Sequence, residues 1–432
     1  MGYSQEKRRL LSMAFEEFFL LIGAVILIGF VGSLVRQRTK IPEALFLILF
    51  GLFLGPFTGI VSGEALLEFV PIVSIAAMIL ILVDAGIEFD LFKITAMFGE
   101  AAIFTVLIAV LTTIFVAFFL INFYGWEPGH AALLGIICSG TTTITAMSLL
   151  ERLDVRNKVK RLILLETIIN DFTLILGTLL IVESIKFAAF SIEVAGRLLV
   201  SEISIAVVAG VAFGFAWRYV LEDLNLTKEL NYASTIGLCF VLYHVAAFLG
   251  GNSIIAIFAF SLFLGNYYKI YDFIKGEPRR EAEEEFKSVL KSIRLVQTDI
   301  TFFVKSFFFV LLGITFNPLV LERISVFLVA GIVLLILIAR FITSAFISRM
   351  DRDFSRYRML MSVMIPRGYV AAALAFVPAQ QGIEIPLFTD IVVILIIVTT
   401  VIAILGTTVY ARTAEGKKEV RTEKEKPVRR KR

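Results

Sequence analysis

Long apolar segments dominate this sequence and constrain its fold more than any other feature. Of the 432 residues, 58% are hydrophobic and only 18% are charged, a composition outside the range of soluble globular proteins. A helix of about 20 apolar residues crosses a bilayer core about 30 Å thick. Thirteen such segments follow one another: Phe15–Val35, Ile41–Ile60, Val70–Phe89, Phe98–Phe123, His130–Leu150, Leu162–Val182, Leu198–Leu221, Leu230–Leu249, Asn252–Tyr271, Ile300–Leu321, Ser325–Ile347, Tyr357–Gln380 and Phe388–Tyr410. We therefore predict an all-α, multi-pass membrane protein.

The charges of the loops alternate along the chain and predict its orientation in the membrane. One alternate set is acidic or nearly neutral, and the other set is cationic. The cationic set comprises residues 36–40, 152–161, the stretch around 279–280, 349–358 and the tail after Arg412. The positive-inside rule places this set in the cytoplasm. Thirteen segments then place the C-terminus in the cytoplasm and the N-terminus outside, although Lys7, Arg8 and Arg9 favour a cytoplasmic N-terminus.

Composition also bounds the domains and the chemistry. We predict a membrane transporter domain over residues 1–410, which includes a cytoplasmic amphipathic linker helix over 275–294, and a basic cytoplasmic tail over 411–432. The net charge of +4 lies mostly in loops and tail, so it indicates topology and not nucleic-acid binding. With two histidines and two cysteines, the chain offers no histidine-ligated metal site, and we expect no cofactor.

A polar face inside the sixth segment is the strongest candidate for a functional site. Positions three and four apart on a helix are neighbours, so Glu166 lies beside Asn170 and Thr167 beside Asp171. An ionised carboxylate in hydrocarbon costs at least about 2.5 kcal/mol. Two carboxylates within six residues, together with an amide and a hydroxyl, therefore indicate a buried site for hard monovalent cations, which prefer oxygen ligands.

Two other segments carry residues that disfavour a continuous helix. The fifth contains Gly140 followed by three threonines, whose hydroxyls can bond to the backbone and bend a helix. The twelfth contains Pro366, which lacks a backbone donor, and Gly368. We predict a break in each. The breaks are equivalent if helices 1–6 are repeated, inverted, as helices 8–13, an arrangement typical of secondary transporters. Small-residue packing is the alternative interpretation of the fifth segment.

Charged residues elsewhere in the apolar segments need partners or a surface. Arg340, in the middle of the eleventh segment, is costly to bury unpaired, and Asp84 and Glu166 are its candidate partners in a structural ion pair. Lys305 is expected to extend to the cytoplasmic surface. Boundary positions at the other end of the sixth segment are expected for Glu183 and Lys186.

The pattern as a whole resembles the NhaP-type sodium/proton antiporters of the monovalent cation:proton antiporter superfamily. The likeness covers nearly the whole membrane region. In chain order the matching runs are Asp84-Ala85-Gly86, Gly140-Thr141, Glu166-Thr167-Ile168-Ile169-Asn170-Asp171, Phe307 to Gly313, Ile338-Ala339-Arg340 and Arg367-Gly368. Six motifs in the same order are more specific than any one of them.

The resemblance implies roles for the polar face of the sixth segment. Asp171 would accept the ion or the proton, and Asn170 would be the neutral partner that marks electroneutral exchangers. Glu166, the Thr167 hydroxyl and the Thr141 carbonyl would complete a sodium site. Arg340 would be structural. Thr142 and Arg367 are further candidates for the site.

The sequence departs from the family at one position. Thr142 and Thr143 stand where the family often has an aspartate followed by a proline. The site thereby has one fewer negative group, which leaves potassium/proton exchange open beside exchange of sodium or lithium.

Exchange follows from competition for a single group. A carboxylate in a water-poor cavity holds its proton more tightly than one in water, and a bound cation displaces that proton. If the empty site does not cross the membrane, each crossing carries either a proton or a cation. We therefore expect an electroneutral antiporter in the cell membrane, a non-enzyme that acts as a homodimer on monovalent cations and protons.

Two alternatives from other classes remain. An intramembrane aspartyl enzyme would use Asp84 and Asp171 as a dyad, but the Gly-x-Gly-Asp run expected around such aspartates is absent from the sequence. A channel or a transport-dead sensor would favour a polar stripe along several helices. The polar residues gather at one depth instead, which favours a carrier.

Overall fold

The computed structural model describes residues 23, 26–32, 43–61, 70–89, 97–151, 153, 155–186, 192–223, 227–275, 280–316, 318, 322 and 324–413. Every regular element in this part of the chain is helical. The elements are α2 (Glu43–Leu52), η1 (Phe53–Phe57), α4 (Val70–Glu88), α5 (Phe98–Tyr124), α6 (Pro128–Ile137), α7 (Thr143–Leu150), α8 (Asn157–Lys186), α9 (Ile192–Asp223), α10 (Lys228–Phe248), α11 (Ser253–Lys275), α12 (Arg280–Thr315), α14 (Val326–Met350), η2 (Arg352–Tyr357), α15 (Arg358–Val363), α16 (Tyr369–Leu374), α17 (Val377–Gln380) and α18 (Phe388–Arg412). The prediction of an all-α fold is confirmed.

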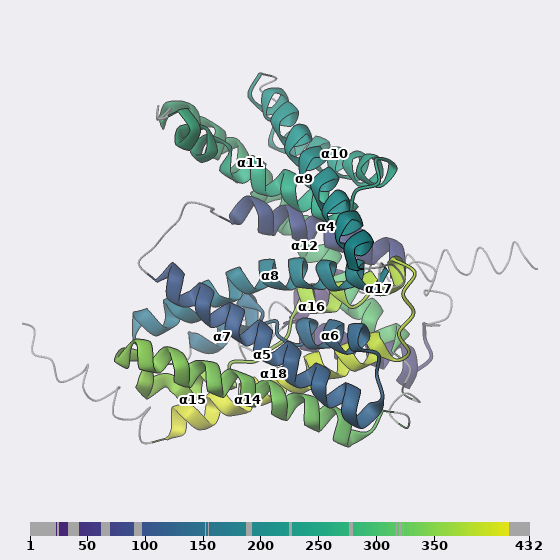
Figure 1. Cartoon of the computed structure of the whole chain (residues 1–432), viewed down its shortest axis with the longest axis vertical. Helices are drawn as coiled ribbons and strands as arrows, with labels where there is room; N and C mark the ends of the chain where they lie inside the picture. The colour runs from purple at the N-terminus through teal and green to yellow at the C-terminus, as the bar shows by residue number, and fades with distance from the viewer. Residues whose placement is uncertain are drawn as a thin grey trace, which may run out of the picture.

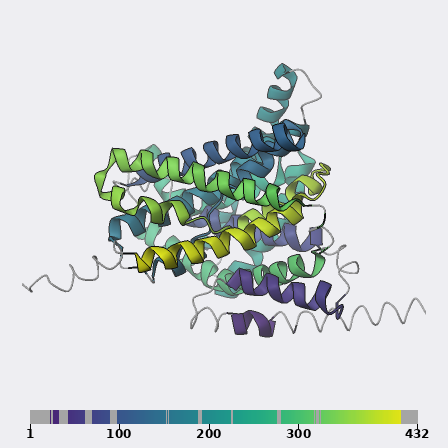
Figure 2. The same cartoon turned by 90° about the horizontal axis from the view of Figure 1, so that it is seen from below.

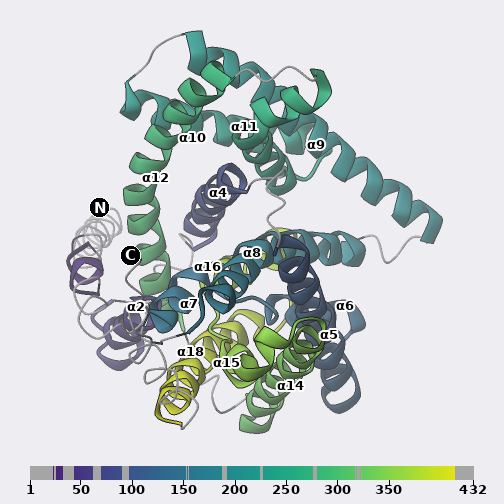
Figure 3. The same cartoon turned by 90° about the vertical axis from the view of Figure 1, so that its left-hand side faces the viewer.

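The helices pack as two bundles (Figures 1 and 3). The core bundle consists of α5, α6, α7, α8 and α14 to α18, and Figure 2 shows α14 in green alongside α18 in yellow. The panel bundle consists of α2, α4 and α9 to α12. Contact between the bundles runs mainly through α16 with α4, α8 with α4 and α9, and α18 with α2. The interface is therefore narrow compared with the packing inside each bundle.

Glycines allow close helix packing inside the panel bundle. A Cβ at Gly51 of α2 would lie 2.1 Å from the Val310 carbonyl oxygen of α12, and one at Gly313 would lie 2.3 Å from that of Ile48. Each helix thus places a glycine where the partner backbone passes. Small residues are the usual means of close helix contact in membranes, where lipid removes the hydrophobic drive for association.

Apolar helices account for most of the predicted membrane segments. Among the described residues, seven helices are long and apolar enough to cross a membrane, and five shorter apolar helices cover 43–57, 72–87, 128–137, 300–315 and 369–380. Most of the first predicted segment, Phe15–Val35, lies outside the described residues, as does the tail after Thr413. The count of thirteen therefore stays a prediction, as does the inverted repeat.

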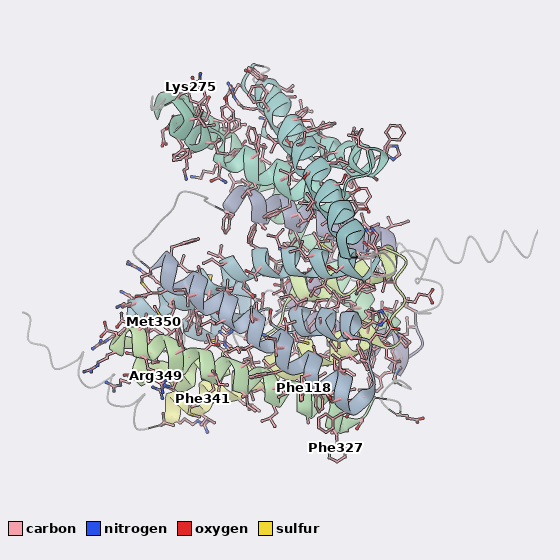
Figure 4. The ribbon with its side chains drawn as sticks, viewed as in Figure 1. Phe118, Lys275, Phe327, Phe341, Arg349 and Met350 are labelled. Atoms are coloured by element: carbon pink, nitrogen blue, oxygen red, sulfur yellow. The ribbon has the colours of Figure 1, made fainter. Side chains whose placement is uncertain are left out.

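The outer surface of the core bundle suits lipid. Phe118 of α5 and Phe327 and Phe341 of α14 are 64%, 83% and 51% exposed, and Phe327 projects beyond the lower edge of the bundle in Figure 4. The basic residue Arg349 lies at the left-hand end of α14, and Lys275 at the left-hand end of α11. Both residues belong to, or adjoin, loops predicted to be cytoplasmic. The two bundles thus place these basic ends on the same side.

The predicted linker helix is continuous with the tenth segment, because α12 extends without a break from Arg280 to Thr315. Phe286, Leu290 and Ile293 are buried at a helical spacing, whereas Glu284 and Lys287 are exposed. This part of α12 is therefore amphipathic, as the sequence predicts.

Candidate functional site

Two broken helices cross at the centre of the candidate site. The first break separates α6, which ends at Ile137, from α7, which begins at Thr143. The second separates α15, which ends at Val363, from α16, which begins at Tyr369. Both breaks lie where the sequence predicts them. Each leaves backbone groups without helical partners in the middle of the protein, which membrane proteins tolerate where those groups line a cavity or bond to protein.

The two unwound segments contact each other directly. The Thr142 amide donates a hydrogen bond of 3.0 Å to the Pro366 carbonyl oxygen. A Cβ at Gly368 would lie 2.3 Å from the Thr142 Cβ, so glycine is needed for this close approach. Arg367, which is 3% exposed, donates to the carbonyl oxygens of Gly140 and, at 3.2 Å, of Ile365. A buried guanidinium thus satisfies carbonyls that the two breaks free.

Asp171 of α8 lies at this crossing. It lines a small cavity of about 10 Å³ together with Gly140, Thr141 and Thr142 of the first break, Gly368 of the second, Leu174 of α8, and Val370 and Ala371 of α16. That volume is close to the least that holds one water molecule. The cavity therefore fits one small particle beside a carboxylate, between two unwound segments.

Asn170 adds an acceptor beside the crossing. Its Nδ2 donates a hydrogen bond of 3.4 Å to the Thr141 carbonyl oxygen. Its Oδ1 is buried and has no hydrogen-bond partner in the described part of the chain. Buried side-chain oxygens are nearly always paired. The unpaired amide oxygen therefore indicates a place for a cation or a water molecule.

Thr167 is engaged by Thr143, which the sequence marked as a departure from the family but not as a site residue. The Thr143 hydroxyl donates to the Thr167 hydroxyl at 3.0 Å, and Thr167 donates to the Leu164 carbonyl oxygen at 2.9 Å. Thr143 begins α7, so this chain of bonds ties the first break to α8. The run of three threonines was the only sequence signal that could have identified Thr143.

Arg340 forms its ion pair with Glu166. Two nitrogens of the guanidinium donate to the two carboxylate oxygens at 3.1 and 2.9 Å, and the side chains are 1% and 0% exposed. Arg340 also donates to the Thr141 hydroxyl at 3.0 Å and to the Met361 carbonyl oxygen at 2.8 Å. Of the two partners that the sequence left open, the structure thus selects Glu166. Because both Glu166 oxygens accept from Arg340, the carboxylate holds α14 to α8.

Asp84, the other candidate partner, lies in a different place. It lines a cavity of about 270 Å³ between the two bundles, to which α2, α4, α7, α12 and α16 contribute. Thr142 and Gly368 line both this cavity and the small cavity at Asp171. The large cavity therefore ends at the crossing of the broken helices.

Lys305 lies in the same large cavity as Asp84. Its ammonium lies 3.8 Å from the centre of the Tyr369 ring, and both residues line the large cavity with Asp84. The side chain extends toward the start of α16 and lines the cavity, and its expected approach to the cytoplasmic surface stays a prediction. Sequence alone does not show whether a lysine near the end of an apolar segment extends to the membrane surface or into a cavity of the protein, because its long side chain can reach either.

Comparisons with known proteins bear on what this site does. The model of the family described as "Sodium/hydrogen exchanger, transmembrane" matches residues 22–413. The low-affinity Na⁺/H⁺ antiporter NhaS1 from Synechocystis sp. is 24% identical over 266 residues, which cover 60% of this chain and 48% of that protein. The chain thus spans about half the length of this curated relative.

The fold is shared with solved structures. The sodium proton antiporter MjNhaP1 from Methanocaldococcus jannaschii at pH 8 superposes with a TM-score of 0.68 at 20% sequence identity, over 94% of this chain and 99% of that chain. An electron-microscopy structure of MjNhaP1 gives a TM-score of 0.63 at 19% identity over the same shares. At this identity the likeness establishes the fold.

Proposed function

Because the chain belongs to the sodium/hydrogen exchanger family, we propose that it exchanges one sodium ion for one proton across the cell membrane, with both competing for Asp171. Membership in a family of transporters also removes the aspartyl-enzyme alternative. The observation that carries the proposal is the setting of Asp171. Its cavity admits one small particle, it lies where two unwound helices cross, and it adjoins the larger cavity between the bundles.

The ligands near Asp171 suit a sodium ion. Sodium is a hard cation that takes oxygen ligands, and half-helix ends with freed carbonyls are the usual cation sites of secondary transporters. The Asn170 Oδ1 is buried without a partner, and the Thr141 carbonyl lies beside the same amide. Together with the Asp171 carboxylate these oxygens form our proposed site. Glu166 contributes through Arg340 and not as a ligand.

Proton binding and cation binding would exclude each other at this site. A cavity of about 10 Å³ holds at most one small particle, so a bare cation and a proton would compete for the same Asp171 oxygens. When Asp171 takes a proton, its charge is lost and so is the attraction for a cation. Asn170 stays neutral in both states. One proton per cation is therefore the simplest stoichiometry.

Movement of one bundle against the other would carry the site across the membrane. The unwound segments and Asp171 belong to the core bundle, and the interface with the panel bundle is narrow. On the topology predicted from loop charge, the large cavity opens toward the cytoplasm, because Glu43 at its edge follows the basic loop 36–40. The structure then represents the inward-facing arrangement of a transporter with alternating access.

The test uses purified protein in liposomes that contain a pH-sensitive dye and an imposed proton gradient. Sodium, lithium and potassium are added in turn to the wild type and to Asp171→Asn. We expect sodium or lithium to dissipate the gradient in the wild type, and no exchange in Asp171→Asn. Asp353→Asn is the matched control, because Asp353 is 49% exposed and pairs with Arg156 and Lys158 in another part of the core bundle.

Three outcomes decide the proposal. Normal sodium exchange by Asp171→Asn would refute the role of Asp171. A response to potassium alone would convert the function to potassium/proton exchange, for which the absence of an acid at Thr142 is the sequence basis. No response to any of these cations from folded protein, at acid and alkaline pH, would favour the transport-dead sensor.

A further inference from the structure

A second polar cluster joins the two bundles far from the site of Asp171. Glu183, near the end of α8, is 0% exposed. Its Oε1 accepts a hydrogen bond of 2.8 Å from Asn252, which precedes α11, and its Oε2 accepts one of 2.8 Å from Lys186. The sequence indicated boundary charges here. Instead, the structure buries the carboxylate in contact with the other bundle.

Lys186 and two glutamines extend the contact. The Lys186 ammonium lies 3.7 Å from a Glu202 oxygen of α9 and donates to Gln381 at 3.4 Å. Gln380 of α17 donates a hydrogen bond of 2.7 Å to the hydroxyl of Ser74 on α4, which is 0% exposed. We name these residues the latch: Glu183, Lys186, Gln380 and Gln381 from the core bundle, and Ser74, Glu202 and Asn252 from the panel bundle.

The latch lies at the opposite end of the interface from the large cavity. Along α8, twelve residues separate Asp171 from Glu183, which at 1.5 Å per residue is about 18 Å. Along α4, ten residues separate Ser74 from the cavity residue Asp84, which is about 15 Å. The interface is thus hollow at one end and bonded by charged groups at the other.

We propose that the latch holds the two bundles together at this end while the cavity is open, and that it must release for the opposite side to open. The inference rests on the proposed exchange by movement of the bundles. Its physical basis is the cost of separating Glu183 from its donors. A buried carboxylate that loses a hydrogen-bonding partner keeps its desolvation penalty.

Asn252 offers a substitution that breaks the latch without breaking the helix. Its Oδ1 accepts from the backbone amides of Ile254 and Ile255 at 3.0 and 3.1 Å and so caps α11, while its Nδ2 donates to Glu183. Asn252→Asp keeps an oxygen for the cap, because aspartate and asparagine cap equally well. It removes the donor and adds a third carboxylate to a cluster that already contains those of Glu183 and Glu202.

The double variant Glu183→Gln with Asn252→Asp tests the contact itself. It exchanges the carboxylate and the amide between the bundles, so that a hydrogen bond of the opposite direction can form. Asn122→Asp is the matched control. Asn122 is exposed on α5 and donates to the Phe118 carbonyl oxygen of its own helix at 2.7 Å, so the same chemical change there leaves the interface untouched.

The readout is the reactivity of a buried thiol. Met78 of α4 is 2% exposed and lines a small space together with residues of α4, α10 and α11 and with Gln380 of the core bundle. In Met78→Cys protein, the rate of maleimide labelling at that position, measured by mass spectrometry of the peptide, reports how often the interface opens. We expect Asn252→Asp to raise this rate about tenfold, which corresponds to about 1.4 kcal/mol. In the double variant the rate should return to within about twofold of the starting value.

An unchanged labelling rate in folded Asn252→Asp protein overturns the proposal. So does an increase that Asn122→Asp reproduces, or one that the double variant does not reverse. If Asn252→Asp does not fold, Lys186→Met provides the test, because it leaves Glu183 and Glu202 facing each other without their shared cation, and an unchanged rate again overturns the proposal. Labelling needs no transported ion, so a failure of sodium/proton exchange is distinguishable from a failure of the latch.

Discussion

The ion pair of Glu166 and Arg340 yields the sharpest test of how the site is built. In Glu166→Gln the guanidinium stays buried at 1% exposure and loses its counter-charge. At the observed N–O separations of 2.9 and 3.1 Å, and with the effective dielectric constant of about 20 that suits buried pairs, the attraction is about 5 kcal/mol. Measured losses on removing one partner of a buried pair are about 3–5 kcal/mol. We therefore expect a loss of about 3–5 kcal/mol of stability.

The assay is reversible unfolding in mixed detergent micelles, followed by tryptophan fluorescence. Glu284→Gln is the control, because its pair with Lys287 is exposed at 75% and 49% and should contribute little. The double variant Glu166→Gln with Arg340→Met should lose much less than the sum of the single changes, since neither charge is then left alone.

A loss for Glu166→Gln as small as that of the exposed control would refute this reasoning. It would mean that the Glu166 carboxylate is not bound by Arg340 in solution. The carboxylate would then be available to a cation, as the family resemblance implied. A large loss with retained sodium exchange in the surviving folded fraction would confirm a structural role.

Two further substitutions test the crossing and the cytoplasmic end. Gly368→Ala places a methyl group 2.3 Å from the Thr142 Cβ, so we expect destabilisation of about 1–3 kcal/mol and loss of exchange, and Thr142→Gly should restore part of the stability. At the end of α14, the hydrogen bond from Lys158 lowers the pKa of Asp351 below its ordinary value of 3.8. Because the folded pKa is the lower one, this contribution is present above pH 3.8 and is lost as the pH falls through the folded value. As the pH falls below 3.8, Asp351→Asn should therefore lose less free energy of unfolding than the wild type does. The difference between the two losses should be under about 1 kcal/mol in an unfolding titration.

The sequence predicted those parts of the site that depend on local geometry. Residues three and four apart on a helix must share a face, so the neighbours of Asp171 followed from spacing alone. The two breaks followed from residues that weaken a helix wherever they occur, such as Pro366 and Gly368. Local rules of this kind hold inside a membrane because the lipid forces every apolar segment into a helix.

Pairings between distant segments were not accessible in the same way. The sequence offered Arg340 two acids, and only the packing of α14 against the core bundle decides for Glu166. The bond between Glu183 and Asn252 joins residues 69 positions apart, and an asparagine in a Gly-Gly turn carries no sign of a buried partner. For Lys305 the sequence did not show in which direction the side chain extends. It placed the residue near the end of an apolar segment without indicating that it lies in the cavity.

The charges at the crossing bear on how much charge would move in each exchange. Glu166 and Asp171 are acids, and Arg340 and Arg367 are bases, so with both acids ionised these four groups cancel. Glu166 is fixed by Arg340, and Arg367 donates to carbonyl oxygens, so within this set our proposal assigns the exchange of cation and proton to Asp171. A proton or a sodium ion at Asp171 then gives the same net charge to the moving bundle. On the proposed mechanism the outward and inward crossings therefore carry equal charge in opposite directions, and the exchange is electroneutral because Asn170, beside the site, cannot ionise.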